Sequence, residues 1–202
     1  TTGSNNTAIG KDALTTLTSG SENTGVGKDA LQFLTTGTNN SCVGNRAGEA
    51  LTTGSSNTAI GSAALLSNTT ASDNVALGKS ALQQNTTGAS NVAVGRGALD
   101  ANTTASNNTG IGHLSLSENT TGTQNTAVGA YALDANTTAD SNTAIGYQSL
   151  SANTTGYQNT AVGEQSLILN TTGYRNTAIG FESLEDNTTG NYNSGLGYGS
   201  LA

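Results

Sequence analysis

The chain has 202 residues, of which 33% are apolar and only 9% are charged, and it lacks proline, methionine and tryptophan. A composition this polar is typical of disordered chains, unless stacked repeats share one continuous core. The net charge of −7 lies after residue 96, where eight acidic residues accompany one base, Arg175. So acidic a surface argues against nucleic acid as a partner, and the lack of any run of 18 apolar residues argues against membrane insertion.

A seventeen-residue repeat runs through the whole sequence. Its marker is a glycine that occurs at Gly10 and then at every seventeenth residue up to Gly197, with no insertion or deletion. We number the positions of the repeat from this glycine, as position 0, and call the twelve residues that share a position a column. Because loops tolerate insertions, their absence indicates that the turns are stacked as well. The sequence predicts one solenoid domain over residues 1–202, with twelve coils.

The first predicted strand of each coil covers positions −4 to 0, which read Asn-Thr-Ala-Ile-Gly or a close variant. Alternation places positions −3 and −1 on one face, and Val75 and Val92 at position −3 favour that face as the inner one. Position −2 should then point outward, yet it excludes large and charged residues. We therefore expect this column to pack against another chain. Its members are Ala8, Gly25, Cys42, Ala59, Ala76, Ala93, Gly110, Ala127, Ala144, Ala161, Ala178 and Gly195.

A second short strand is predicted near positions +3 to +6, with the Leu of position +4 pointing inward. Position +7 is Leu in the first three full coils and Asn from Asn68 to Asn187, which predicts an inward asparagine ladder at a turn. The short apolar segments and the many Gly and Asn residues do not suit long helices. The predicted fold is therefore all-β, a parallel β-solenoid or β-roll.

Six columns, at positions +1, +2, +5, +6, +11 and +12, hold all charged residues, all aromatic residues and the one histidine. We expect these columns to face outward. Tyr157 and Tyr174 share position +11, and the next coil has Tyr192 at +12. Such exposed rings are candidates for stacking on sugars or on the side chains of a partner, or else they stack on one another and stabilise the coils. Position +1 adds three more candidates, Tyr147, Phe181 and Tyr198.

The sequence predicts no catalytic, cofactor or metal site. The stretch at residues 24–29 is similar to a phosphate-binding loop, but Glu22 and Asp29 stand where that loop needs Gly and Ser or Thr. His113 has no second histidine and no nearby cysteine, which a zinc site would require. We expect a protein that is not an enzyme.

The phrases NTAIG and NTAVG, with Ala or Ser three residues after the glycine, resemble the head coils of trimeric autotransporter adhesins. The fuller phrase NTAIG…SL…NTTG also resembles repeats of tail-fibre-like proteins of phages and bacteria. The present repeat is longer than that of the adhesin heads. The resemblance implies a left-handed β-roll, three chains side by side, and a location outside the cell or on a cell or virion surface.

The leading functional hypothesis is an extracellular structural and adhesive fibre module. We expect it to associate with itself, as a homotrimer or as an end-to-end filament, and to attach to a surface glycan or a host-surface protein. Because the repeat is already in progress at both ends, we expect uncapped ends and a longer parent chain or polymer. The alternative is an ice-binding β-solenoid, because position +8 is always Thr and position +9 is Thr or Ser.

Overall fold

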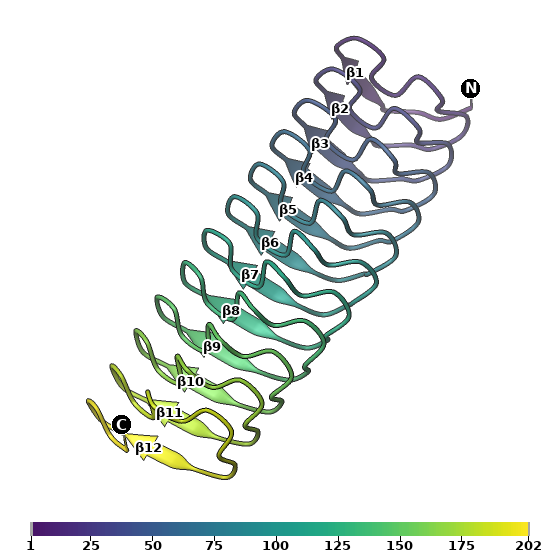
Figure 1. Ribbon diagram of the computed structural model, residues 1–202. Helices are drawn as coiled ribbons and strands as arrows, with labels where there is room; N and C mark the ends of the chain where they lie inside the picture. The colour runs from purple at the N-terminus through teal and green to yellow at the C-terminus, as the bar shows by residue number, and fades with distance from the viewer. Residues whose placement is uncertain (1, 202) are drawn as a thin grey trace.

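The structure is a computed structural model that describes residues 2–201, and it is a parallel β-solenoid. Each repeat forms one coil with one three-residue strand, and the twelve strands form a single parallel sheet in sequence order (Figure 1). The strands are Thr7–Ile9 (β1), Thr24–Val26 (β2), Ser41–Val43 (β3), Thr58–Ile60 (β4), Val75–Leu77 (β5), Val92–Val94 (β6), Thr109–Ile111 (β7), Thr126–Val128 (β8), Thr143–Ile145 (β9), Thr160–Val162 (β10), Thr177–Ile179 (β11) and Ser194–Leu196 (β12).

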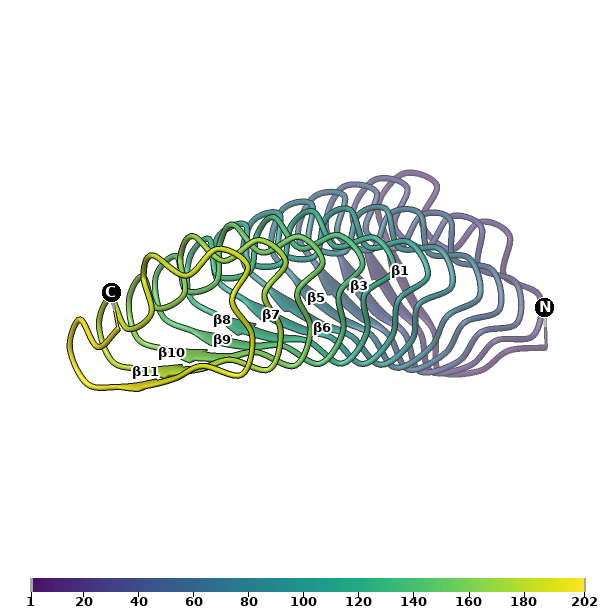
Figure 2. The same ribbon diagram turned by 60° about the horizontal axis from the view of Figure 1, so that its bottom comes forward.

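The register of the sheet equals the sequence repeat. Thr7 pairs with Thr24 in β1 and β2, and Thr177 pairs with Ser194 in β11 and β12, so each residue lies beside its equivalent in the next coil. This confirms the predicted parallel solenoid with one coil per repeat. Figure 2 shows the strands along one long side of the flattened coils. Residues 2–201 form no helix, and hence none long and apolar enough to cross a membrane.

The core is a narrow column of small side chains around one leucine per coil. The Leu of position +4 is buried in ten of the described coils, as predicted, and Leu65, Leu99 and Leu133 are among those with no exposed surface. Ala or Ser at position +3 and Leu or Asn at position +7 fill the space on either side of it. Each coil therefore buries little apolar surface of its own, and its stability depends on the neighbouring coils.

The predicted orientation of the strands was wrong. Position −2, expected to face another chain, points into the coil and is buried in every coil except the first, where Ala8 is exposed. Positions −3 and −1, expected inside, face outward. The reason is the width of the coil: a Cβ atom at Gly25 would lie 3.3 Å from Cγ of Leu14, which leaves room for Gly, Ala or Cys only. The small residues of this column are thus core residues, and they are not available to a second chain.

The predicted second strand is a turn. Positions +2 and +4 adopt left-handed backbone conformations in every coil, with φ of 53° at Leu99 and 55° at Leu150. Bulky residues rarely adopt this conformation because their Cβ crowds the backbone. Here it turns positions +3 and +4 toward the core one after the other, which a strand could not do. Burial of the leucine offsets the strain.

Position 0 requires glycine for two reasons. At Gly112, φ is +137°, which side chains rarely tolerate, and a Cβ atom would lie 2.4 Å from the carbonyl oxygen of Gly129 in the next coil. The same close approach recurs at the other glycines of this column that have a following coil. This explains why the marker glycine never varies.

Two ladders of buried asparagines run along the axis. At position −4, Oδ1 of Asn108 accepts a hydrogen bond from the backbone N–H of Asn125 (2.9 Å), and its Nδ2 donates to the carbonyl of Gly122 (2.8 Å). At position +7, Nδ2 of Asn102 donates to Oδ1 of Asn85 (2.8 Å). The second ladder confirms the prediction for position +7. Both ladders satisfy polar groups that burial would otherwise leave unpaired.

One coil departs from the repeat at two positions that touch each other. Cys42 is the one cysteine of position −2, and Gly48 of the same coil is the one glycine of position +4. A Cβ atom at Gly48 would lie 2.8 Å from Sγ of Cys42 and 3.2 Å from Cδ2 of Leu31. The larger residue at one position thus fills the space that the smaller one leaves at the other.

We expect the substitutions Cys42→Ala and Gly48→Leu to be coupled. Cys42→Ala leaves a cavity and Gly48→Leu overpacks the coil, so each alone should lower the free energy of unfolding by about 1–3 kcal/mol. The double variant restores the residues of the other coils, and should be at least as stable as the wild type. Urea unfolding of the four proteins measures the coupling. Additive losses in the double variant would show that the two residues are independent.

Burial also fixes the chemistry of Cys42. It raises the pKa of the thiol from its ordinary value of 9.0 to about 12, against a smaller lowering by a hydrogen bond with the backbone of Ala59. In the unfolded chain the thiol ionises near pH 9. Between pH 9 and 12 the unfolded state therefore binds fewer protons than the folded state, and stability falls as pH rises.

We expect the wild type to lose about 1.4 kcal/mol of stability, relative to Cys42→Ala, for each unit by which the pH rises in that range. The comparison cancels every contribution that the two proteins share. Urea midpoints at several pH values measure it. A difference that does not vary with pH would mean that the thiol is accessible to solvent in the folded state.

Candidate functional site

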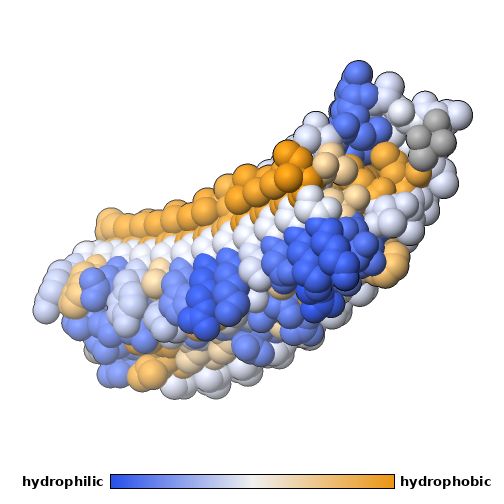
Figure 3. Space-filling model, turned by 90° about the horizontal axis from the view of Figure 1, so that it is seen from above, coloured by the Kyte–Doolittle hydropathy of each residue, from blue (hydrophilic) through white to orange (hydrophobic). Residues whose placement is uncertain are grey.

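A ridge of aliphatic side chains, exposed in seven coils and half-buried in the other five, runs along the outer face of the sheet. Ile60 is 46% exposed and Ile145 is 40% exposed, although both lie in the middle of the rod. Figure 3 shows the ridge as a continuous hydrophobic line. We call this column, position −1, the apolar ridge; its members are Ile9, Val26, Val43, Ile60, Leu77, Val94, Ile111, Val128, Ile145, Val162, Ile179 and Leu196.

The surroundings of the apolar ridge are uncharged. Position −3, the other outward column of the sheet, is Thr, Ser or Val, and position 0 on the other side is glycine. Charged residues occur only in the six variable columns, the nearest of which lie two residues beyond either end of each strand. A partner that covered the sheet would remove apolar surface from water and few polar groups. Parallel sheets normally have both faces covered, and the described chain covers the inner face alone.

The sequence prediction missed the apolar ridge because it assigned position −1 to the core. One signal pointed the other way: position −3 is Thr or Ser in ten of the twelve repeats, which suits an outer face. The two valines at this position, Val75 and Val92, outweighed it in the prediction. In the structure both are half-buried on the outer face, beside the ridge.

The tyrosine row, Tyr157, Tyr174 and Tyr192, is brought together as the sequence suggested. The rings of Tyr157 and Tyr174 stack at 4.8 Å and 3°, and Tyr192 meets Tyr174 edge-on at 5.4 Å. Arg175 lies 5.6 Å from the ring centroid of Tyr192 and donates hydrogen bonds to its hydroxyl and to Oε1 of Gln158 (both 2.8 Å). The rings therefore use much of their faces on one another. Binding of a sugar or partner by this row stays a prediction.

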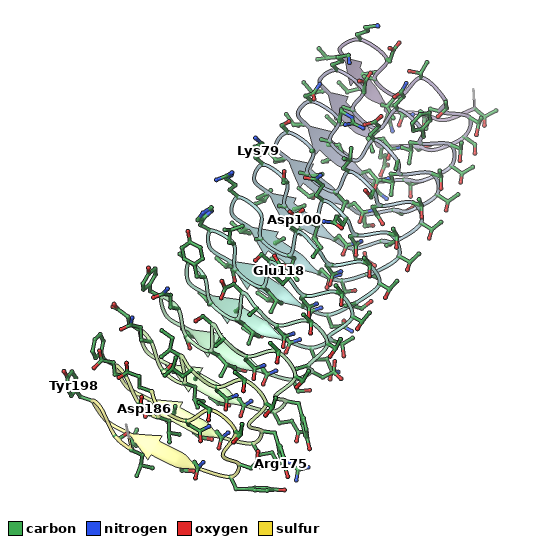
Figure 4. All side chains as sticks on the ribbon, in the orientation of Figure 1. Lys79, Asp100, Glu118, Arg175, Asp186 and Tyr198 are labelled. Atoms are coloured by element: carbon green, nitrogen blue, oxygen red, sulfur yellow. The ribbon has the colours of Figure 1, made fainter. Side chains whose placement is uncertain are left out.

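The aromatic residues of position +1 lie at the other edge of the rod. Figure 4 places Tyr198 and Arg175 at opposite edges. Phe181 and Tyr198 stack at 5.4 Å and 10°, whereas Tyr147 meets Tyr131 edge-on at 6.3 Å. The six aromatic candidates thus form separate groups at two edges, and no single surface presents them all.

Three carboxylates lie on consecutive coils between the two edges. Figure 4 shows Asp100 and Glu118 on the same face, and Asp134 follows in the next coil. Within the described chain, Oδ1 of Asp100 and Oδ1 of Asp134 are buried and make no hydrogen bond. Burial chiefly raises the pKa of both carboxyls, and the charge of Glu118 adds to it. Residues 2–201 contain no group of three acids, histidines or cysteines placed to hold a metal ion.

The threonines of position +8 use their hydroxyls within the fold. Oγ1 of Thr35 donates to the carbonyl of Thr52 (3.0 Å), and Oγ1 of Thr86 donates to that of Thr103 (2.9 Å). The same bond recurs along much of the column. Position +9 is exposed in every described coil, as at Thr87. The two threonine columns therefore do not present a pair of free hydroxyl ranks to solvent.

Comparison with protein-family models, with curated proteins and with solved structures finds no match to this chain. What the chain does must therefore be argued from its own residues.

Proposed function

We propose that this chain is a rod-shaped structural and adhesive module of an extracellular fibre, and that it associates with copies of itself along the apolar ridge. The ridge is the observation that carries the proposal. Scattered exposed aliphatic residues are ordinary on a protein surface, but a contiguous line of them marks an interaction site. Here the line follows the open face of a parallel sheet for the length of the rod.

A second copy of the chain is the partner that fits the ridge best. The side chains of the ridge repeat with the rise of the coils, about 4.8 Å for paired strands. A neighbour with the same rise can pack its own ridge against this one along the whole length. The uncharged columns on either side of the ridge allow such an approach without burying an unpaired charge.

A trimer is the expected state. The NTAIG phrase resembles the adhesin heads in which three chains lie side by side, and three ridges that face a common axis would shield one another from water. In that arrangement the variable columns at the two edges of each rod remain outside. A fixed frame with variable outer columns suits attachment to a surface glycan or to a partner protein.

The mass of the full chain in solution, from sedimentation equilibrium, tests the proposal. We expect a discrete species of three times 20.0 kDa. A series of ever larger species would favour an end-to-end filament, which keeps the structural role and removes the trimer. A monomer at all concentrations would overturn self-association. Thermal hysteresis should then be measured, because freezing-point depression would favour the ice-binding alternative.

A further inference from the structure

A hollow of about 240 Å³ is lined by residues of three consecutive coils, in the region of positions +1 to +5. It exists because Gly97 has no side chain at position +2, where the neighbouring coils have Ser80 and Leu114. A Cβ atom at Gly97 would lie 2.7 Å from Cδ2 of Leu114 and in open space otherwise. We call this the cationic hollow; its walls are Lys79, Ser80, Arg96, Gly97, Asp100 and Leu114.

Two cations at this hollow lack an anionic partner. Within the described residues Lys11, Lys28 and Arg46 each pair with a neighbouring carboxylate, whereas Lys79 and Arg96 make no ion pair. Lys79 and Arg96 occupy equivalent positions in adjacent coils, so that two like charges lie side by side. Such a pair is unfavourable unless something compensates it. In a chain with a net charge of −7, an unpaired cationic pair is suited to an anion from outside.

The hollow also offers an acceptor. Asp100 lines it, and no hydrogen bond of the described chain uses the carboxylate of Asp100, whose Oδ1 is itself buried and closed to a ligand, so that a donor would have to approach Oδ2. A simple anion would be repelled by this carboxylate and would have no hydrogen-bond donor to offer it. A ligand that carries both an anionic group and hydroxyl groups would satisfy the cations and the acceptor together. That combination describes an acidic sugar.

We propose that the cationic hollow binds one acidic sugar residue, with its carboxylate against Lys79 and Arg96 and one of its hydroxyls donating to Asp100. This inference rests on the adhesive part of the proposed function, because it names the class of glycan that the rod attaches to. The edge continues from the hollow with His113 and Tyr131, whose rings lie 5.4 Å apart, so a longer acidic saccharide has further polar and aromatic groups to contact.

Isothermal titration of the full chain with trigalacturonic acid tests the site, with maltotriose as the neutral control and acetate as the simple-anion control. Arg96→Gln should weaken binding of trigalacturonic acid by about tenfold or more, because it removes a charge-assisted hydrogen bond. Lys28→Gln is the matched control, since it removes a cation of the same column that is already paired with Asp29. The Lys28→Gln variant should bind trigalacturonic acid with the affinity of the wild type.

Gly97→Gln tests the shape of the hollow separately from its charge. Gln occurs at the same position in other coils, as Gln148 and Gln165, with the same left-handed backbone, so the coil should accept it once the end of the half-buried Leu114 side chain moves away from the new Cβ atom. The side chain fills the space, and binding should be lost while the melting temperature changes little. Circular dichroism of each variant confirms that it is folded.

The outcomes separate this site from the proposed function. Equal binding of acetate would mean general attraction of anions and would overturn the sugar site, and so would equal affinities of the Arg96→Gln and Lys28→Gln variants. A wild-type chain that forms trimers but binds no trigalacturonic acid overturns the sugar site and leaves the fibre module in place. A wild-type chain that is monomeric and binds no sugar overturns both.

Discussion

Replacing Ile111 and Ile145 of the apolar ridge with glutamate should convert the proposed trimer into monomers. Both side chains are exposed in the single chain, so glutamate at these positions remains in water when the chain is alone. In an assembly that buries the ridge, each chain would instead bury two unpaired charges, at a cost of several kcal/mol each. Sedimentation equilibrium of the double variant should therefore give 20.0 kDa at concentrations where we expect the wild type to give three times that mass.

The matched control places the same charges on another face. Thr104→Glu with Thr138→Glu changes two exposed residues of position +9 in two coils of the middle of the rod. This variant should keep the mass of the wild type. If both double variants keep that mass, the ridge is not the contact, and if both lose it, added negative charge rather than its location separates the chains.

The second large effect is expected for Asn108→Ala, in the middle of the ladder at position −4. The change removes the acceptor for the backbone N–H of Asn125 and the donor to the carbonyl of Gly122, both inside the coil. Two buried backbone groups then lack partners, at about 1–3 kcal/mol each, so the free energy of unfolding should fall by about 2–6 kcal/mol. Urea unfolding followed by circular dichroism measures this loss.

Thr104→Ala is the control for this variant, because it removes an exposed side chain from the preceding turn. Its stability should stay within about 0.5 kcal/mol of the wild type. A similarly small loss for Asn108→Ala would mean that water enters the coil and replaces the amide, and that the ladder contributes little. Because each coil contacts only its neighbours, the large loss should also make unfolding less cooperative, with the two halves of the rod separating at this coil.

Much of the fold can be predicted from the sequence because the repeat never changes length. The constant spacing of the marker glycines requires equivalent residues to lie side by side, which gives the coil number, the parallel sheet and its register. The inward leucine at position +4 follows from its near invariance. The asparagine ladder at +7 follows from Leu17, Leu34 and Leu51, since a column that accepts leucine in some coils is buried in the others.

The strand face and the turn could not be predicted in the same way. Small residues at position −2 are expected if the strand packs against another chain, and equally if it faces a leucine of its own chain. Only the width of the coil distinguishes these two arrangements. The turn at positions +1 to +6 depends on left-handed backbone at residues such as Leu99 and Tyr131, which the identity of those residues disfavours. A local pattern does not reveal a conformation that stacking imposes.

The candidate sites were predictable to different degrees. The tyrosine row follows from column spacing alone, because residues at equivalent positions in adjacent coils must be neighbours. The cationic hollow does not, since it depends on the missing side chain of Gly97 and on the carboxylate of Asp100, which makes no hydrogen bond within the described chain. The apolar ridge is visible in the sequence as a column, but the side to which the column points decides whether it is core or surface, and the prediction of that side was wrong.

The direction of the hydrogen bonds has a mechanical consequence. The strands lie across the rod, so the bonds that join one coil to the next run along its length, and they are loaded one coil at a time when the ends are pulled apart. Each coil that detaches releases seventeen residues, about 55–60 Å of extended chain. A single rod would then lengthen in equal steps under tension and absorb work at each step. Chains joined along their ridges would have to release coils together, which makes a bundle far stiffer than its separate members.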